Sequence, residues 1–119
     1  MSLSKGAETV LARAGGKEKE FDWVGAVPFY EKALSLVLRQ KNFSKAGEIQ
    51  ERIGFCLRRA ATQAETPEEF ENRARSAFEA YKKAAELFGK LGGAKRAEIF
   101  HCMATALYVN SWLSTDLYE

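Results

Sequence analysis

One histidine, His101, and two cysteines, Cys56 and Cys102, are the residues of this chain with the widest range of chemistry. A serine-type triad needs a base, an acid that orients it and a nucleophile on a strained turn, and the chain has no Gly-x-Ser-x-Gly segment. A zinc site needs spacings such as Cys-x-x-Cys or His-x-x-x-His, and these three residues have neither. We therefore expect all three to be structural, and we predict no catalytic residue, metal site or cofactor.

Two further patterns resemble catalytic signatures only in part. The segment Gly89-Lys90-Leu91-Gly92-Gly93 is rich in glycine, but it lacks the preceding strand and the Gly-Lys-Ser/Thr of a P-loop. We interpret it as the end of a helix followed by a turn. The acidic pair Glu68-Glu69 falls at a predicted helix start, where negative charge interacts favourably with the helix dipole. The sequence therefore predicts a protein that is not an enzyme.

The composition is that of a folded, soluble domain. Of 119 residues, 46% are hydrophobic and 29% are charged, and the net charge of +2 gives no basic surplus of the kind that nucleic-acid-binding proteins show. No apolar run reaches the roughly 18 residues of a membrane helix, and no signal peptide opens the chain. Both cysteines lie in apolar helical stretches, which suits buried free thiols in a reducing compartment, although a disulfide between them also fits the sequence. We expect one cytoplasmic domain over residues 1–119.

The apolar residues follow a helical period nearly throughout the chain. This period predicts an all-α fold of five helices. Short connections between them make successive helices antiparallel neighbours. The predicted spans are about 4–19, 22–40, 44–63, 66–90 and 94–113.

Local signals set the ends of these helices. Asp22 is the expected N-cap of the second helix, and Thr66-Pro67-Glu68-Glu69 has the form of a capping box with proline at the first helical position of the fourth. Gly15-Gly16 weakens the first helix and favours an early end. Pro28 predicts either that the second helix begins near Gly25 or that it kinks.

One helical pattern occurs twice, about 50 residues apart. Tyr30 and Tyr81 each follow an alanine by four residues and precede another by three. The first copy, Asp22-Trp23-x-x-Ala26-x-x-x-Tyr30-x-x-Ala33-Leu34, resembles the second helix of a tetratricopeptide repeat. The lengthened helices are more similar to the soluble-NSF-attachment-protein branch of these arrays. The resemblance implies helix pairs held together by small residues and aromatics, and a function of presenting a surface to another protein.

A second resemblance covers the first half of the chain. Residues 7–61 are similar to a three-helix MIT (microtubule-interacting and trafficking) domain, whose third helix ends like Leu57-Arg58-Arg59-Ala60-Ala61. It implies a peptide-binding module and predicts that residues 1–63 fold alone. Some tetratricopeptide repeats hold the C-terminal carboxylate of a partner with Lys, Arg and Asn side chains. Two of those positions are here Leu11 and Gly15, which cannot donate a side-chain hydrogen bond, so this clamp is not expected.

Two places do not fit a helix with a single apolar face. Phe55 lies roughly opposite the apolar stripe of the third helix and is flanked by charged residues, an arrangement typical of a binding hot spot. The fifth helix is apolar on two sides. Its predicted inward stripe is Ile99 or Phe100, Met103, Leu107 and Ser111, and its second stripe is His101, Thr105, Tyr108 and Trp112. Because such helices are normally buried, we expect this chain to be the N-terminal fragment of a longer array or to self-associate through the fifth helix.

The sequence thus predicts an antiparallel helical array that acts as an adaptor by binding a protein or peptide. The predicted anchors are Phe55, Tyr108 and Trp112, while Arg52 and Arg59 orient acidic groups of the partner. The alternative is an RNA-binding helical repeat, although interleaved acids weaken its basic stretch, and we do not expect nucleic acid or membrane insertion. That stretch comprises Lys82, Lys83, Lys90, Lys95 and Arg96.

Overall fold

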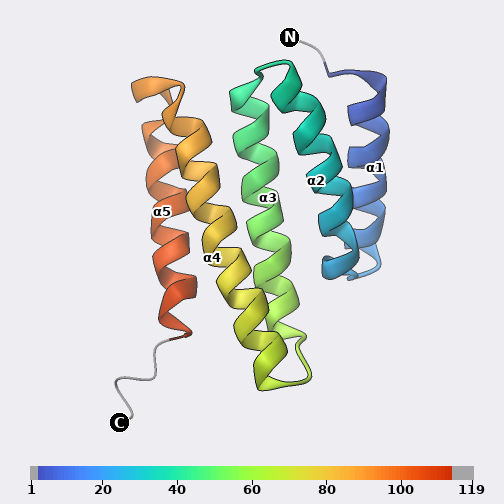
Figure 1. Ribbon diagram of the computed structural model, residues 1–119, viewed down its shortest axis with the longest axis vertical. Coiled ribbons are helices and arrows are strands. Elements are labelled where there is room, and N and C mark those ends of the chain that lie inside the picture. Colours follow the sequence, from blue (N-terminus) through green and yellow to red (C-terminus); the bar gives the residue numbers. More distant parts are fainter. Residues whose placement is uncertain (1–2, 114–119) are drawn as a thin grey trace.

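The helices follow one another in a row, each packed mainly on the helix before it and the helix after it (Figure 1). The computed structural model describes residues 3–113. Its elements are α1 (Lys5–Lys19), α2 (Trp23–Arg39), α3 (Phe43–Thr62), α4 (Pro67–Gly89), the short 3-10 helix η1 (Gly92–Lys95) and α5 (Arg96–Ser111). Successive α-helices run antiparallel, from α1 at one edge to α5 at the other. The predicted all-α antiparallel array of five helices is confirmed.

The helix ends agree with the predicted spans to within about two residues, with two local differences. Gly15-Gly16 does not end α1, which continues to Lys19. Helix α2 begins at Trp23, with the side chain of Asp22 accepting a hydrogen bond from the Gly25 N–H at 2.9 Å, so the N-cap at Asp22 is confirmed and the alternative start near Gly25 is wrong. Pro28 therefore lies inside α2, where its missing N–H leaves the carbonyl of Val24 without its helical donor. Both residues are exposed, so water can replace that donor.

The capping box of α4 is confirmed in one of its two bonds. The Thr66 side chain accepts from the Glu69 N–H at 3.0 Å, as predicted. The carboxylate of Glu69 accepts at 3.2 Å from the N–H of Glu65 rather than from that of Thr66. The reciprocal bond is thus made one residue earlier, and Glu69 also pairs with Arg73 at 3.7 Å.

Small residues bring α3 and α4 together in the largest helix contact of the array. A Cβ added at Gly47 would lie 2.6 Å from the ring of Phe88, and one at Gly54 would lie 3.0 Å from the ring of Tyr81. A contact of 2.6 Å is shorter than real side-chain contacts, so a larger residue at Gly47 requires the ring of Phe88 to shift, and one at Gly54 requires the ring of Tyr81 to move by a few tenths of an ångström. Gly54 thereby holds the repeated tyrosine Tyr81, which is 2% exposed, against α3.

The predicted inward stripe of α5 is wrong except for Ile99, which packs partly buried against α4. Phe100 and Leu107 are 68% and 62% exposed, and Met103 is 39% exposed. The buried face consists of Cys102, Ala106 and Val109. Helix α5 packs mainly on α4, and small side chains allow a closer approach to α4 than bulky ones. Ser111, also predicted to face inward, is exposed.

The turns before α2 and α3 are built alike. Each contains one residue with a positive φ, Phe21 at 61° and Lys41 at 56°. Each then passes to a capping residue, Asp22 or Asn42, whose side chain accepts from the N–H three residues later. A side chain in this left-handed region crowds the backbone and costs roughly 1–2 kcal/mol, which glycine avoids.

We expect Lys41→Gly to raise the free energy of unfolding by about 0.5–1 kcal/mol, because the strain relieved exceeds the extra freedom gained by the unfolded chain. Lys32→Gly, the same change on the exposed side of α2, should lower it by about 1 kcal/mol. Urea denaturation followed by circular dichroism measures both. Equal destabilisation by the two variants would show that Lys41 does not adopt this conformation in solution.

Candidate functional site

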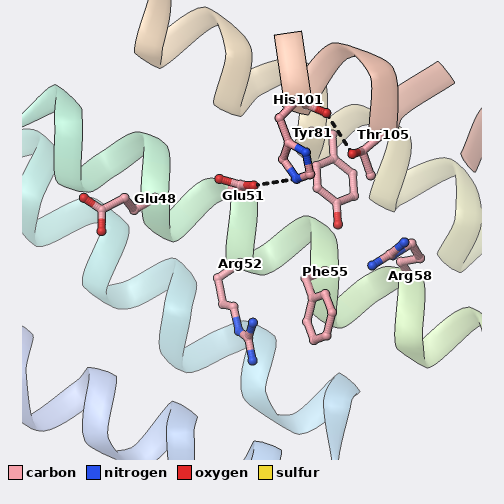
Figure 2. A pocket seen from close by; sticks show the side chains of 8 residues that line it. All are labelled: Glu48, Glu51, Arg52, Phe55, Arg58, Tyr81, His101 and Thr105. Carbon is pink, nitrogen blue, oxygen red and sulfur yellow. Dashed lines mark hydrogen bonds and ion pairs between the residues drawn. The ribbon is translucent and has the colours of Figure 1, made fainter. Parts of the chain in front are cut away.

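The two repeated tyrosines each line a hollow between alternate helices. The first hollow, about 270 Å³, lies between α1 and α3, with Tyr30 of α2 among its lining residues. The second, about 290 Å³, lies between α3 and α5, with Tyr81 of α4 among its lining residues (Figure 2). Its remaining lining residues are Glu48, Glu51, Arg52, Phe55, Arg58, His101 and Thr105. We call these the first and second hollows.

Beside the first hollow, the carboxylate of Glu18 joins three helices. It accepts hydrogen bonds from the hydroxyl of Tyr30 on α2 and from the guanidinium of Arg52 on α3. The Cys56 thiol on α3 lies 3.7 Å from the same carboxylate. Only 11% of the Glu18 side chain is exposed, so these donors replace the water that an exposed carboxylate would bind.

This arrangement shifts the pKa values of its members. Burial raises the pKa of Glu18, but the hydrogen bonds from Arg52 and Tyr30 together outweigh burial and hold that pKa below its ordinary 4.5. Burial and the neighbouring carboxylate raise the pKa of Tyr30. Burial, followed by the charge of Glu18, raises the pKa of Cys56 to about 12. At neutral pH Glu18 is therefore an anion among protonated partners.

Phe55 and Arg52, predicted as binding residues, both line the second hollow. The half-buried Phe55 ring packs edge-on against Trp23, with ring centres 5.6 Å apart. The guanidiniums of Arg52 and Arg58 lie 4.2 and 5.5 Å from its centre. Because Arg52 is already paired with Glu18, it is less able to orient a partner than the sequence suggested.

The other predicted residues lie elsewhere. Trp112 stacks on Phe70, where α5 ends and α4 begins, with ring centres 6.1 Å apart, and Tyr108 meets Trp112 edge-on. Arg59 lies 5.5 Å from the ring of Trp23. None of these predicted residues lines the second hollow. The structure therefore distributes the five predicted binding residues over separate places.

Sequence reasoning missed Arg58 and Tyr81 as parts of a site. Arg58 follows Gly54 by one helical turn. We call the helices around the first hollow, α1 to α3, the first unit, and those around the second hollow, α3 to α5, the second unit. In the first unit, Glu18 follows the buried Ala14 by the same spacing. Comparing these two pairs could have indicated that Glu18 and Arg58 occupy equivalent places.

The basic residues of the RNA-binding alternative are divided by acidic neighbours. Lys83 shares a shallow hollow with Glu31 and Glu79. Lys95 pairs with Glu98 at 3.7 Å. The Lys82 and Lys90 ammonium groups lie near the rings of Phe78 and Phe43, at 5.1 and 5.6 Å.

The chain matches no family model, no curated protein and no solved structure.

Cys56 and Cys102 are buried and unpaired, as predicted for free thiols. Among residues 3–113, no three His, Cys, Asp or Glu side chains gather in a group that could hold a metal ion. In the same part of the chain, no helix combines the length and apolar character needed to cross a membrane.

We expect Glu18→Gln to lower the free energy of unfolding at pH 7 by about 1.5–3 kcal/mol, because its charged hydrogen bonds to α2 and α3 are weakened. The pKa of Glu18 is lower in the folded than in the unfolded state. Its stabilisation is therefore complete above the unfolded pKa near 4.5 and is lost as the pH falls through the folded value. The difference in the free energy of unfolding between wild type and Glu18→Gln should therefore become smaller below pH 4.5, as measured by urea denaturation at a series of pH values.

Glu20→Gln is the matched control, since Glu20 is exposed at the end of the same helix. It should change stability by less than about 0.5 kcal/mol at either pH. If the difference in the free energy of unfolding between wild type and Glu18→Gln did not depend on pH, this would contradict the lowered pKa of Glu18 in the folded state.

Proposed function

We propose that this domain is a non-enzymatic, cytoplasmic protein-interaction module that binds an amphipathic helix of another protein along α5. The observation that carries this proposal is the exposed apolar face of α5. Phe100, Met103 and Leu107 recur there at i, i+3 and i+7, the spacing of one helix face. Apolar side chains gathered in this way, rather than scattered singly, mark interaction sites on proteins.

The array itself supports a helix as the occupant. Helix α3 packs on α2 through Ala46, Ile49, Ile53 and Cys56, and α5 packs on α4 through residues at the same spacing, Ile99, Cys102, Ala106 and Val109. A constant shift of 53 positions relates the two sets. The same shift carries Gly47 and Gly54, which meet α4, onto Phe100 and Leu107. The exposed face of α5 is thus the counterpart of the α3 face that another helix covers.

The sizes of these residues define the chemistry of the partner. On α3, two glycines receive the bulky rings of Phe88 and Tyr81. On α5 the bulky residues, Phe100 and Leu107, belong to the array. A helix that lies along α5 at similar spacing must therefore present small residues, such as alanine or glycine, beside apolar ones.

The remaining chemistry supports binding rather than catalysis. Burial raises the pKa values of both cysteines to about 12, so at neutral pH each is a buried thiol and a weak nucleophile. His101, the single histidine, lies 3.3 Å from the carboxylate of Glu51 and is largely exposed. Buried free thiols also suit the reducing cytoplasm.

We expect Leu107→Glu to weaken partner capture at least about tenfold, because it places a charge in the apolar contact. The wild-type chain is immobilised and exposed to lysate of the source organism, beside Leu107→Glu and the control Val24→Glu. Val24 is 46% exposed on α2, so the control adds the same charge away from α5. The proposal requires a protein lost only with Leu107→Glu, whose segment protected in hydrogen exchange is an amphipathic helix.

Two results would overturn this proposal. One is a set of captured proteins that Leu107→Glu leaves unchanged. The other is a dimer, seen by light scattering over a concentration series and dissolved by Leu107→Glu, which would assign the face to a second copy of the chain instead.

A further inference from the structure

The helices around the two hollows carry opposite charges at one equivalent position. In each case a small residue of the odd-numbered helix, Ala14 or Gly54, precedes a charged residue by one turn, and of these residues only Arg58 itself lines a hollow. That charged residue is Glu18 on α1 and Arg58 on α3. The accompanying tyrosine is Tyr30 in the first hollow and Tyr81 in the second. The first unit thus contains its own carboxylate, whereas the second has a guanidinium in the equivalent place.

Arg58 has no counter-charge in the described part of the chain. Its Nε is buried and has no hydrogen-bond partner among residues 3–113. Of the two acids that line the second hollow, Glu48 lies 3.6 Å from Lys45 and Glu51 lies 3.3 Å from His101. Of the two arginines, Arg52 is paired with Glu18, so Arg58 is the one without an acidic partner among the described residues. A buried donor without an acceptor costs free energy. Because Arg58 as a whole is only partly buried and lines the hollow, an anion there can interact with its guanidinium.

The surrounding groups are placed to receive an anion. Figure 2 shows the hydroxyl of Tyr81 and the guanidinium of Arg58 pointing toward the same region, with the ring of Phe55 beside them. The Tyr81 ring is held against Gly54, so its hydroxyl position is fixed by packing. In the first unit, the same pair of donor types, a tyrosine hydroxyl and an arginine, holds the carboxylate of Glu18.

We propose that the second hollow binds the side-chain carboxylate of an aspartate or glutamate from a protein partner, held by Arg58 and Tyr81 as Glu18 is held by Arg52 and Tyr30. A side chain, rather than a chain end, is the donor that the first unit uses. Phe55, half-buried at the edge of the hollow, receives an apolar residue next to that acid. This inference rests on the proposed binding function, since it names the chemistry of a second contact with a partner protein.

The test is a titration of the full-length chain with three capped dipeptides, followed by nuclear magnetic resonance of the Arg58 Nε–H. Acetyl-Phe-Glu-amide should shift this resonance as its carboxylate binds the guanidinium. Acetyl-Phe-Gln-amide, which lacks the charge, should bind at least about tenfold more weakly. Acetyl-Phe-Gly with a free C-terminal carboxylate should bind more weakly than the glutamate peptide.

Three variants locate the site. Arg58→Gln should weaken the glutamate peptide about tenfold or more, and Tyr81→Phe, which keeps the ring against Gly54, about fivefold. Arg39→Gln is the matched control, because Arg39 is exposed at the end of α2 and outside the second hollow, and it should change the affinity less than about twofold. Thermal unfolding followed by circular dichroism confirms that each variant is folded.

Equal binding of the glutamate and glutamine peptides, or an unshifted Arg58 resonance at saturation, would overturn the carboxylate site. Tighter binding of the free C-terminal carboxylate would overturn its assignment to a side chain. The two proposals fail separately. If the dipeptides do not distinguish glutamate from glutamine, partner capture that depends on Leu107 still stands. If partner capture does not depend on Leu107, the preference of the second hollow for the glutamate dipeptide still stands.

Discussion

Gly47 and Gly54 hold α3 against α4 at a distance that no larger residue at either position allows without displacement of an aromatic ring. This contact fixes the ring of Tyr81 against α3. The position of α4 in turn determines where α5 lies, because α5 packs on α4 through its own small residues, Cys102 and Ala106. Both candidate binding surfaces, the second hollow and the exposed face of α5, follow from this one close approach.

Electrostatics distinguishes the two units that packing makes alike. Glu18 accepts hydrogen bonds from donors on α2 and α3, so these donors find their acceptor within the first unit itself. The second unit has Arg58 where the first has Glu18, and the carboxylate that would complete it is missing from the described chain. The first unit thus uses its charged residue to stabilise the fold, whereas the charged residue of the second has no acidic partner among the described residues.

The helices and their order were predictable, because the spacing of apolar residues and the caps at Asp22 and Thr66 are local signals. The inward face of α5 was not. A helix at the edge of an array has one neighbour, and periodicity alone does not say which of two apolar stripes that neighbour covers. Arg58 was missed as a site residue for a different reason. Its role depends on Tyr81, which belongs to another helix, so no local pattern contains both.

The two thiols lie at different depths in this row of helices. Cys56 belongs to a cluster formed mainly by α1, α2 and α3, with Ala80 of α4, whereas Cys102 packs with Ala84, Ala85 and Phe88 of α4. Detachment of α5 is enough to uncover Cys102, while Cys56 stays covered until the first three helices separate. In an array stabilised by contacts between neighbours, edge and centre open with different free energies. The alkylation rates of the two native cysteines therefore report the opening of the edge and of the centre separately, without an introduced label.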